Sequence, residues 1–143
     1  MGHQDKGHFA AKHKAHRINE VVADKIKAIA DNESITCSSA HQISKAVSLS
    51  PAEIGIQIDL LEFRITECQL GLFGYCNGGK KINPEIKITP DLGDRLEKSA
   101  VDGRLSCLSC WDIATDLKMK RIDMGSSCEK MNIRIKPCQL GSF

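Results

Sequence analysis

Two stretches of the chain decide its fold: ITCSSAHQISKAVSLSPAEIGIQIDLLEFRITECQLGLF at residues 35–73 and LSCLSCWDIATDLKMKRIDMGSSCEKMNIRIKPCQLGSF at residues 105–143. They align without a gap when the sequence is shifted by 70 residues, and 11 of their 39 positions are identical. Apolar character is also kept at equivalent positions, such as Ile54 and Met124. Because both copies keep the same apolar positions, they indicate one small structural unit that occurs twice.

Each copy predicts three helices followed by a short strand. Apolar spacing and capping residues place the helices at about 18–31, 38–48 and 51–62 in the first copy, and at about 91–101, 108–118 and 121–132 in the second. Ser50-Pro51 marks the start of a third helix, since serine is a good N-cap and proline suits the first helical position. A short extended step precedes each second helix, and the alternating residues 63–66 and 133–136 predict a half-buried strand.

The order of helix, three- or four-residue turn, helix and strand resembles the winged helix-turn-helix family of DNA-binding domains. The resemblance covers about 22–73 and 92–143 and implies a mostly α protein with short β strands, made of two tandem winged helix-turn-helix-like three-helix units. It also implies that the third helix of each unit enters a DNA major groove. The hairpin that forms the wing in this family is expected to be truncated or absent in the second copy, because Phe143 follows directly on its closing turn.

Charge and composition divide the chain into four expected segments. These are a flexible basic, histidine-rich tail at 1–17, a first repeat at 18–75, a linker at 76–90 and a second repeat at 91–143. The net charge is +3 over residues 1–19, −4 over 20–75, +2 over 76–89 and +1 over 90–143. No run of 18 apolar residues occurs, so we expect a cytoplasmic protein without a membrane partner.

The second repeat and the tail have the side chains that DNA binding needs. The outer residues of the third helix of the first repeat are acidic or uncharged. The acidic side chains repel phosphate, and the uncharged ones do not attract it by charge. The second repeat and the tail instead offer cations and hydroxyls able to contact phosphates and base edges: Lys118, Lys120, Arg121, Ser126, Ser127 and Lys130, with Lys12, Lys14 and Arg17 of the tail. The sequence therefore predicts a double-stranded-DNA-binding protein of the transcription-regulator type.

Two other functions stay open. The acidic first repeat is suited to a protein-interaction module that presents a groove to a partner protein. A thiol-based metal or redox sensor would use cysteines that stand 31 residues apart in each copy: Cys37 with Cys68, and Cys107 with Cys138. The competing structural interpretation is that these small, soft side chains fill a tight junction that both copies inherited.

An enzyme is not indicated. His41 is the only histidine outside the tail, and the chain has no glycine-rich phosphate loop, nucleophile elbow or paired metal-ligand motif. We therefore expect no catalytic residue and no cofactor.

Glycine stands inside both predicted third helices, at Gly55 and Gly125, where it costs about 1 kcal/mol relative to alanine. Its presence in both copies predicts a close approach of another backbone through helix packing, and a nearby phosphate would demand the same absence of a side chain. The repeated Gln-Leu-Gly at the end of each strand predicts a turn in which Gly71 and Gly141 adopt positive φ.

Overall fold

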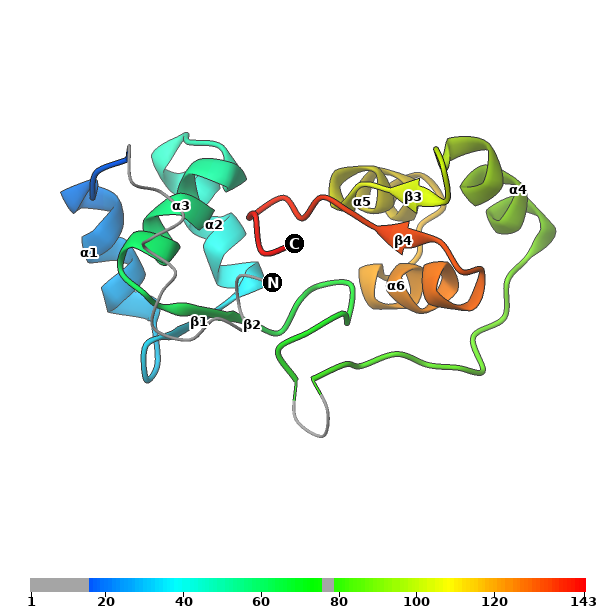
Figure 1. Ribbon diagram of the computed structural model, residues 1–143, viewed down its shortest axis with the longest axis horizontal. Helices are drawn as coiled ribbons and strands as arrows, with labels where there is room; N and C mark the ends of the chain where they lie inside the picture. Colours follow the sequence, from blue (N-terminus) through cyan, green and yellow to red (C-terminus); the bar gives the residue numbers. More distant parts are fainter. Residues whose placement is uncertain (1–15, 76–78) are drawn as a thin grey trace. The chain divides into compact units, whose positions relative to one another are not determined.

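The computed structural model describes residues 16–75 and 79–143, and it is mostly helical with a few short strands, as the sequence predicts (Figure 1). The first copy contains α1 (Glu20–Ile29), β1 (Ser34–Thr36), α2 (Cys37–Val47), α3 (Pro51–Leu60) and β2 (Arg64–Thr66). The second contains α4 (Pro90–Ser99), β3 (Arg104–Leu105), α5 (Cys107–Asp116), α6 (Arg121–Lys130) and β4 (Arg134–Ile135). Each helix begins and ends within about two residues of the range expected from the sequence.

The two copies repeat at the level of secondary structure as well as sequence. α4 and α6 begin and end 70 residues after α1 and α3. Ile35 lies opposite Ile65 in the β1–β2 pair, and Leu105 lies opposite Ile135 in the β3–β4 pair. The gapless alignment is therefore also the structural alignment.

Side-chain caps explain where most of the helices begin. Thr36 and Ser106 accept a hydrogen bond from the backbone N–H three residues later and start α2 and α5 directly after the extended step. Ser50 accepts from the backbone N–H of Glu53 at 3.2 Å, with Pro51 at the first helical position of α3, as the sequence predicts. Each such bond satisfies one of the N–H groups that a helix leaves without an internal partner.

The strands pair in parallel within each copy. In the described part of the chain, β1 pairs only with β2 and β3 only with β4. A parallel pair requires a long crossover, which here consists of the two helices between the strands. The strand expected after the third helix is present, but its partner is the extended step before the second helix, and no antiparallel wing strand follows it among the described residues.

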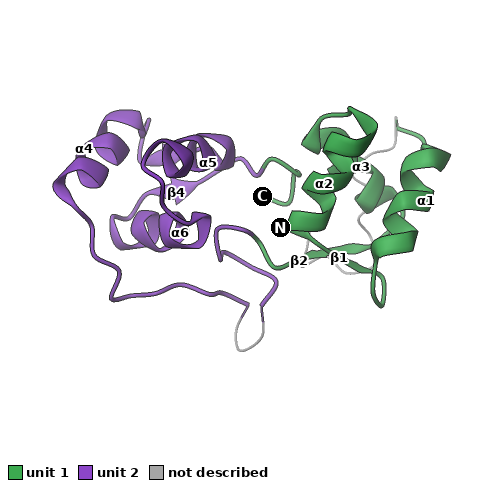
Figure 2. Ribbon diagram, turned by 180° about the vertical axis from the view of Figure 1, so that it is seen from behind, with its two compact units in different colours: residues 1–68, 139–143 green, residues 69–138 purple. Residues whose placement is uncertain are grey.

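The chain forms two compact units whose boundaries differ from those of the sequence repeats (Figure 2). The first unit contains the chain up to Cys68 together with Gln139–Phe143, and the second contains Gln69–Cys138. The repeats were expected at 18–75 and 91–143. The closing segment of each sequence repeat is thus part of the unit built mainly from the other repeat.

The helical glycines explain why the closing segments are held so tightly. A Cβ placed on Gly55 would lie 1.8 Å from the carbonyl oxygen of Leu140, and one placed on Gly125 would lie 1.7 Å from that of Leu70. The predicted close approach of backbone to glycine is confirmed, and the approaching backbone belongs to the Gln-Leu-Gly turns. Gly71 and Gly141 have φ of 78° and 80°, also as predicted.

The cores of the two units use equivalent apolar residues. Ile26, Ile35, Ile54 and Ile65 are buried in the first unit, and their counterparts Leu96, Leu105, Met124 and Ile135 are buried in the second. Leu140 and Leu70, from the closing segments, are also buried. None of the described helices has the length and the apolar composition that a membrane span requires.

We expect alanine at either helical glycine to destabilise its unit. Gly55→Ala and Gly125→Ala each force a methyl group against a backbone carbonyl that cannot rotate away. Overpacking costs about 1–3 kcal/mol and the gain in helix propensity offsets about 1 kcal/mol, so the free energy of unfolding should fall by up to about 2 kcal/mol in a urea titration.

Gly93→Ala on α4 is the matched control. Its added Cβ would meet only the Cγ2 of Ile88 at 3.5 Å, an ordinary contact, and the first copy has Ala23 at this position. This variant should be as stable as the parent or more stable. Equal stability of all three variants would contradict the proposed tight contact.

Candidate nucleic-acid interface

The turn between α5 and α6 carries two lysines that the corresponding turn of the first unit lacks. Lys118 has φ of 54° and is exposed, and Lys120 is the exposed N-cap residue of α6. The first unit has serine at both equivalent positions, and Ser48 has nearly the same φ of 58°. The two turns thus share their backbone conformation but differ by two positive charges.

The start of α6 lacks the side-chain cap found at the start of α3. Lys120 makes no capping hydrogen bond, whereas Ser50 caps α3. The backbone N–H of Asp123 bonds instead to the carbonyl of Lys120 at 3.1 Å. The positive end of the α6 dipole lies next to two lysines, while the Asp123 side chain in the first turn offsets part of it. This local field favours an anion.

Arg121 is committed to contacts within the second unit. Its guanidinium lies 3.7 Å from the ring centroid of Trp111 and donates a hydrogen bond to Oε1 of Gln69 at 3.3 Å. This arginine is half-buried and links α5, the start of α6 and the closing segment at Gln69–Gly71. It is a positioning residue for this surface, with less freedom to contact DNA than a solvated arginine would have.

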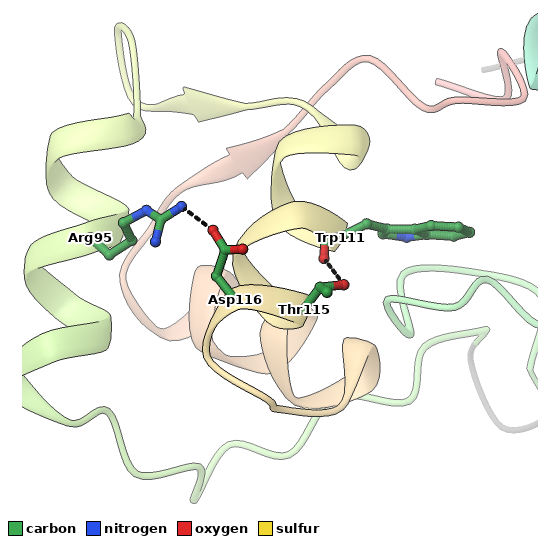
Figure 3. A network of polar contacts seen from close by, with 4 residues as sticks. All are labelled: Arg95, Trp111, Thr115 and Asp116. Carbon is green, nitrogen blue, oxygen red and sulfur yellow. Dashed lines mark hydrogen bonds and ion pairs between the residues drawn. The ribbon is translucent and has the colours of Figure 1, made fainter.

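Trp111 lies on the side of α5 away from α4. Figure 3 shows Arg95 extending from α4 to Asp116 near the end of α5, while the Trp111 ring projects in the opposite direction. The Arg95–Asp116 ion pair has an N–O distance of 2.7 Å, and both side chains are partly exposed. α5 is therefore fixed on one side by an ion pair and on the other by the ring that stacks with Arg121.

Ser126 and Ser127, expected to contact DNA, are buried. Their exposed fractions are 2% and 0%. Ser127 donates to the carbonyl of Asp123 at 2.8 Å, and Ser126 accepts from the backbone N–H of Asn83 at 2.8 Å. Neither hydroxyl reaches a surface, so both are removed from the candidate interface.

The segment before α4 explains this burial. Lys130 donates from Nζ to the carbonyl of Ile86 at 2.8 Å, and Lys80 forms an ion pair with Glu129 at 3.4 Å. Together with the Asn83–Ser126 bond, these contacts place residues 80–86 along α6. The expected linker therefore covers a face of the helix that was expected to enter a DNA groove.

The expected tail residues are only partly within the described structure. Lys12 and Lys14 lie outside the described residues. Arg17 is exposed, and its backbone carbonyl accepts a hydrogen bond from Nε2 of Gln57 at 3.1 Å. Gln57 also accepts from the backbone N–H of Asn19 at 2.7 Å, so this buried residue of α3 holds the start of α1.

A second group of cations, missed by the sequence reasoning, lies on the β3–β4 pair. Arg104 and Arg134 are directly opposite each other in the parallel register, and both are exposed. Lys136, two residues beyond Arg134, is also exposed. We call these three residues the ladder cations. The alternating sequence at 133–136 indicated that Arg134 and Lys136 lie on the exposed side of a strand. It did not indicate that Arg104 is the cross-strand partner of Arg134.

The ladder cations are another difference between the copies. The first unit has Ser34, Arg64 and Thr66 at these positions, so two of the three charges occur only in the second unit. Like charges directly opposite each other across strands are destabilising. Among the described residues, no acidic side chain forms an ion pair with a ladder cation or with Lys118 or Lys120.

The two cationic groups lie at opposite ends of the α5–α6 pair. The strands join the N-terminus of α5 and the C-terminus of α6, and the lysine turn joins the other two ends. A helix of ten residues is about 15 Å long, which sets the approximate separation. A single small anion cannot contact both groups, whereas a polymeric anion can.

The repeated thiols are mostly buried. Cys37, Cys68 and Cys107 are buried and Cys138 is half-buried. The strands next to them pair in parallel within each copy. Within residues 16–75 and 79–143, however, no group of three or more His, Cys, Asp or Glu side chains is arranged to hold a metal ion.

No protein-family model, curated protein or solved structure matches the chain. The interpretation of this surface therefore depends on the residues and contacts of the chain itself.

We expect Lys120→Ser to stabilise the second unit. The substitution supplies the N-cap that Ser50 provides in the first unit, at a position that already has extended backbone with φ −71° and ψ 142°. The free energy of unfolding should rise by about 0.5–1 kcal/mol, measured by urea denaturation. Ser50→Ala is the reciprocal variant and should lower the free energy of unfolding by a similar amount. A loss of stability in Lys120→Ser would instead show that the lysine supports the helix in another way.

Proposed function

We propose that the second unit binds the phosphate backbone of double-stranded DNA, in the manner of a transcription-regulator-like helix-turn-helix protein. The observation that carries the proposal is the presence, at both ends of the α5–α6 pair, of exposed cations that form no ion pair with any residue that the structure describes. Four of these five charges stand on a backbone that the first unit keeps without them, and Arg134 alone has a charged counterpart, Arg64. Charge that the fold does not need is available for an external anion.

Charge along the chain supports this assignment. The second unit contains twelve Lys/Arg against nine Asp/Glu, for a net charge of +3 over residues 69–138. Residues 20–68 carry −4. The second unit is therefore the one that a polyanion would approach, and the first unit is a poor phosphate binder.

The burial of α6 favours contact with phosphates over base reading. Its central residues, Met124 to Cys128, are buried, so few of its side chains can reach base edges. The lysine turn, the uncapped start of α6 and the ladder cations all suit phosphate oxygens. The proposed binding is strong at low salt and discriminates weakly between DNA sequences.

Two double variants test the proposal, with replacements taken from the first unit. Lys118→Ser with Lys120→Ser removes the charges of the lysine turn and adds a helix cap. Arg104→Ser with Lys136→Thr removes two ladder cations. In fluorescence titrations of labelled duplex DNA across salt concentrations, each pair should weaken binding and reduce the slope of log K against log salt by about 2.

The matched control is Lys25→Gln with Lys27→Gln, which removes two exposed charges from α1 of the first unit. It should leave the affinity and the salt slope close to those of the parent. No binding of duplex DNA by the parent at low salt, or equal losses in all three double variants, would overturn the proposal. In that case the acidic first unit, as a protein-interaction module, becomes the leading hypothesis.

A further inference from the structure

The second unit contains two buried thiols that lie side by side on adjacent helices. Cys110 is on α5 and Cys128 is on α6, and their sulfur atoms are 4.0 Å apart. Both side chains have an exposed fraction of 0%. These two cysteines are distinct from the 31-residue pairs that the sequence singled out, and neither is shared with the first unit.

The first unit shows that the fold does not require sulfur at these positions. Ala40 and Ile58 stand where the second unit has Cys110 and Cys128, and both are buried in an equivalent core. Hydrophobic packing alone is therefore satisfied by aliphatic side chains. The paired thiols are a specific feature of the second unit.

We propose that Cys110 and Cys128 form a reversible disulfide when the protein reacts with a hydroperoxide. A disulfide has a sulfur–sulfur bond of about 2.05 Å, so the two sulfurs must approach by about 2 Å from their present separation. This approach requires rotation of the two side chains and a local opening between α5 and α6, which also admits the peroxide to the buried sulfurs. The proposal does not depend on DNA binding.

The hydrogen bond between the sulfurs makes the two thiols unequal. This hydrogen bond raises the pKa of Cys110, and burial raises it further. The same hydrogen bond lowers the pKa of Cys128, although burial acts in the opposite direction. The thiolate is the nucleophilic form of cysteine. Either sulfur can be the donor of this hydrogen bond, and with Cys110 as the donor Cys128 is the first thiol to react.

The reaction balances with hydrogen peroxide as the oxidant. The Cys128 thiolate attacks one peroxide oxygen, an S–O bond forms, the O–O bond breaks, and the departing hydroxide takes up a proton to become water. Cys110, as its thiolate, then attacks the Cys128 sulfur; an S–S bond forms, the S–O bond breaks and a second water leaves. Two thiols lose two electrons, the peroxide gains them, and both thiol protons end in water.

The bond would close a loop around the lysine turn. Cys110 and Cys128 are 18 residues apart, and Lys118 and Lys120 lie between them. Cross-linking α5 to α6 restricts the unfolded chain over this loop, so the oxidised protein should melt about 5 °C or more above the reduced protein.

Peptide mapping of the full chain tests the proposal. The reduced protein is incubated with hydrogen peroxide, its remaining thiols are blocked with iodoacetamide, and it is digested with trypsin without reductant. Cys110 is then in peptide 105–118 and Cys128 in peptide 122–130. We expect these peptides to be joined, with the loss of two hydrogen atoms, and to separate after treatment with dithiothreitol.

Two variants identify the partner of Cys128, because Cys107 is in the same tryptic peptide as Cys110. Cys110→Ala copies the residue of the first unit and should abolish the linked peptide, while Cys107→Ala should retain it. Thermal melts of both reduced variants check that they fold. A parent chain without the linked peptide, or a linked peptide that persists in Cys110→Ala, would overturn the proposal.

Discussion

The contact between a backbone carbonyl and a helical glycine is the constraint on which each unit depends. The Leu140 carbonyl occupies the space where Gly55 would have a side chain, and the Leu70 carbonyl does the same at Gly125. This contact brings a closing segment onto the third helix of each unit. The closing segment covers the side of the third helix that carries the glycine, and the core of the unit covers another side. The middle of each third helix is therefore buried around most of its circumference.

That burial changes how the helix-turn-helix resemblance is understood. A recognition helix presents a row of side chains to DNA bases, but α6 presents mainly its two ends. The cations on which the proposed DNA binding depends are therefore in the turn before α6 and in the β3–β4 strand pair. The copies differ along the same division: the paired apolar core positions stay apolar, while the turn and the strand pair carry more charge in the second unit.

Local features of the fold could be predicted from the sequence, and long-range ones could not. The repeat fixed the order of elements, Ser50-Pro51 located the start of α3, and Gly55 and Gly125 indicated a close backbone approach. These features depend on spacing, capping and steric limits within a short stretch. The exchange of the closing segments depends on residues more than 50 positions apart, which leave no periodic signal.

The candidate site shows the same limit. Lys118 and Lys120 are exposed as expected, since a charged turn has few ways to be buried. We expected Ser126 and Ser127 on the exposed face of α6 because helical periodicity identifies only the face that packs on the core. Residues 80–86 cover a second face of this helix. Arg104 was overlooked because parallel pairing, which sets it opposite Arg134, joins strands separated by two helices.

The discontinuity of the first unit has a consequence for biosynthesis. Its core includes Leu140, although the rest of the unit ends at Cys68. Domains generally fold from the N-terminus as the chain emerges from the ribosome, at about 5–20 residues per second. Here the N-terminal half must wait several seconds for residues 139–143, so the part that is made first reaches its native packing last.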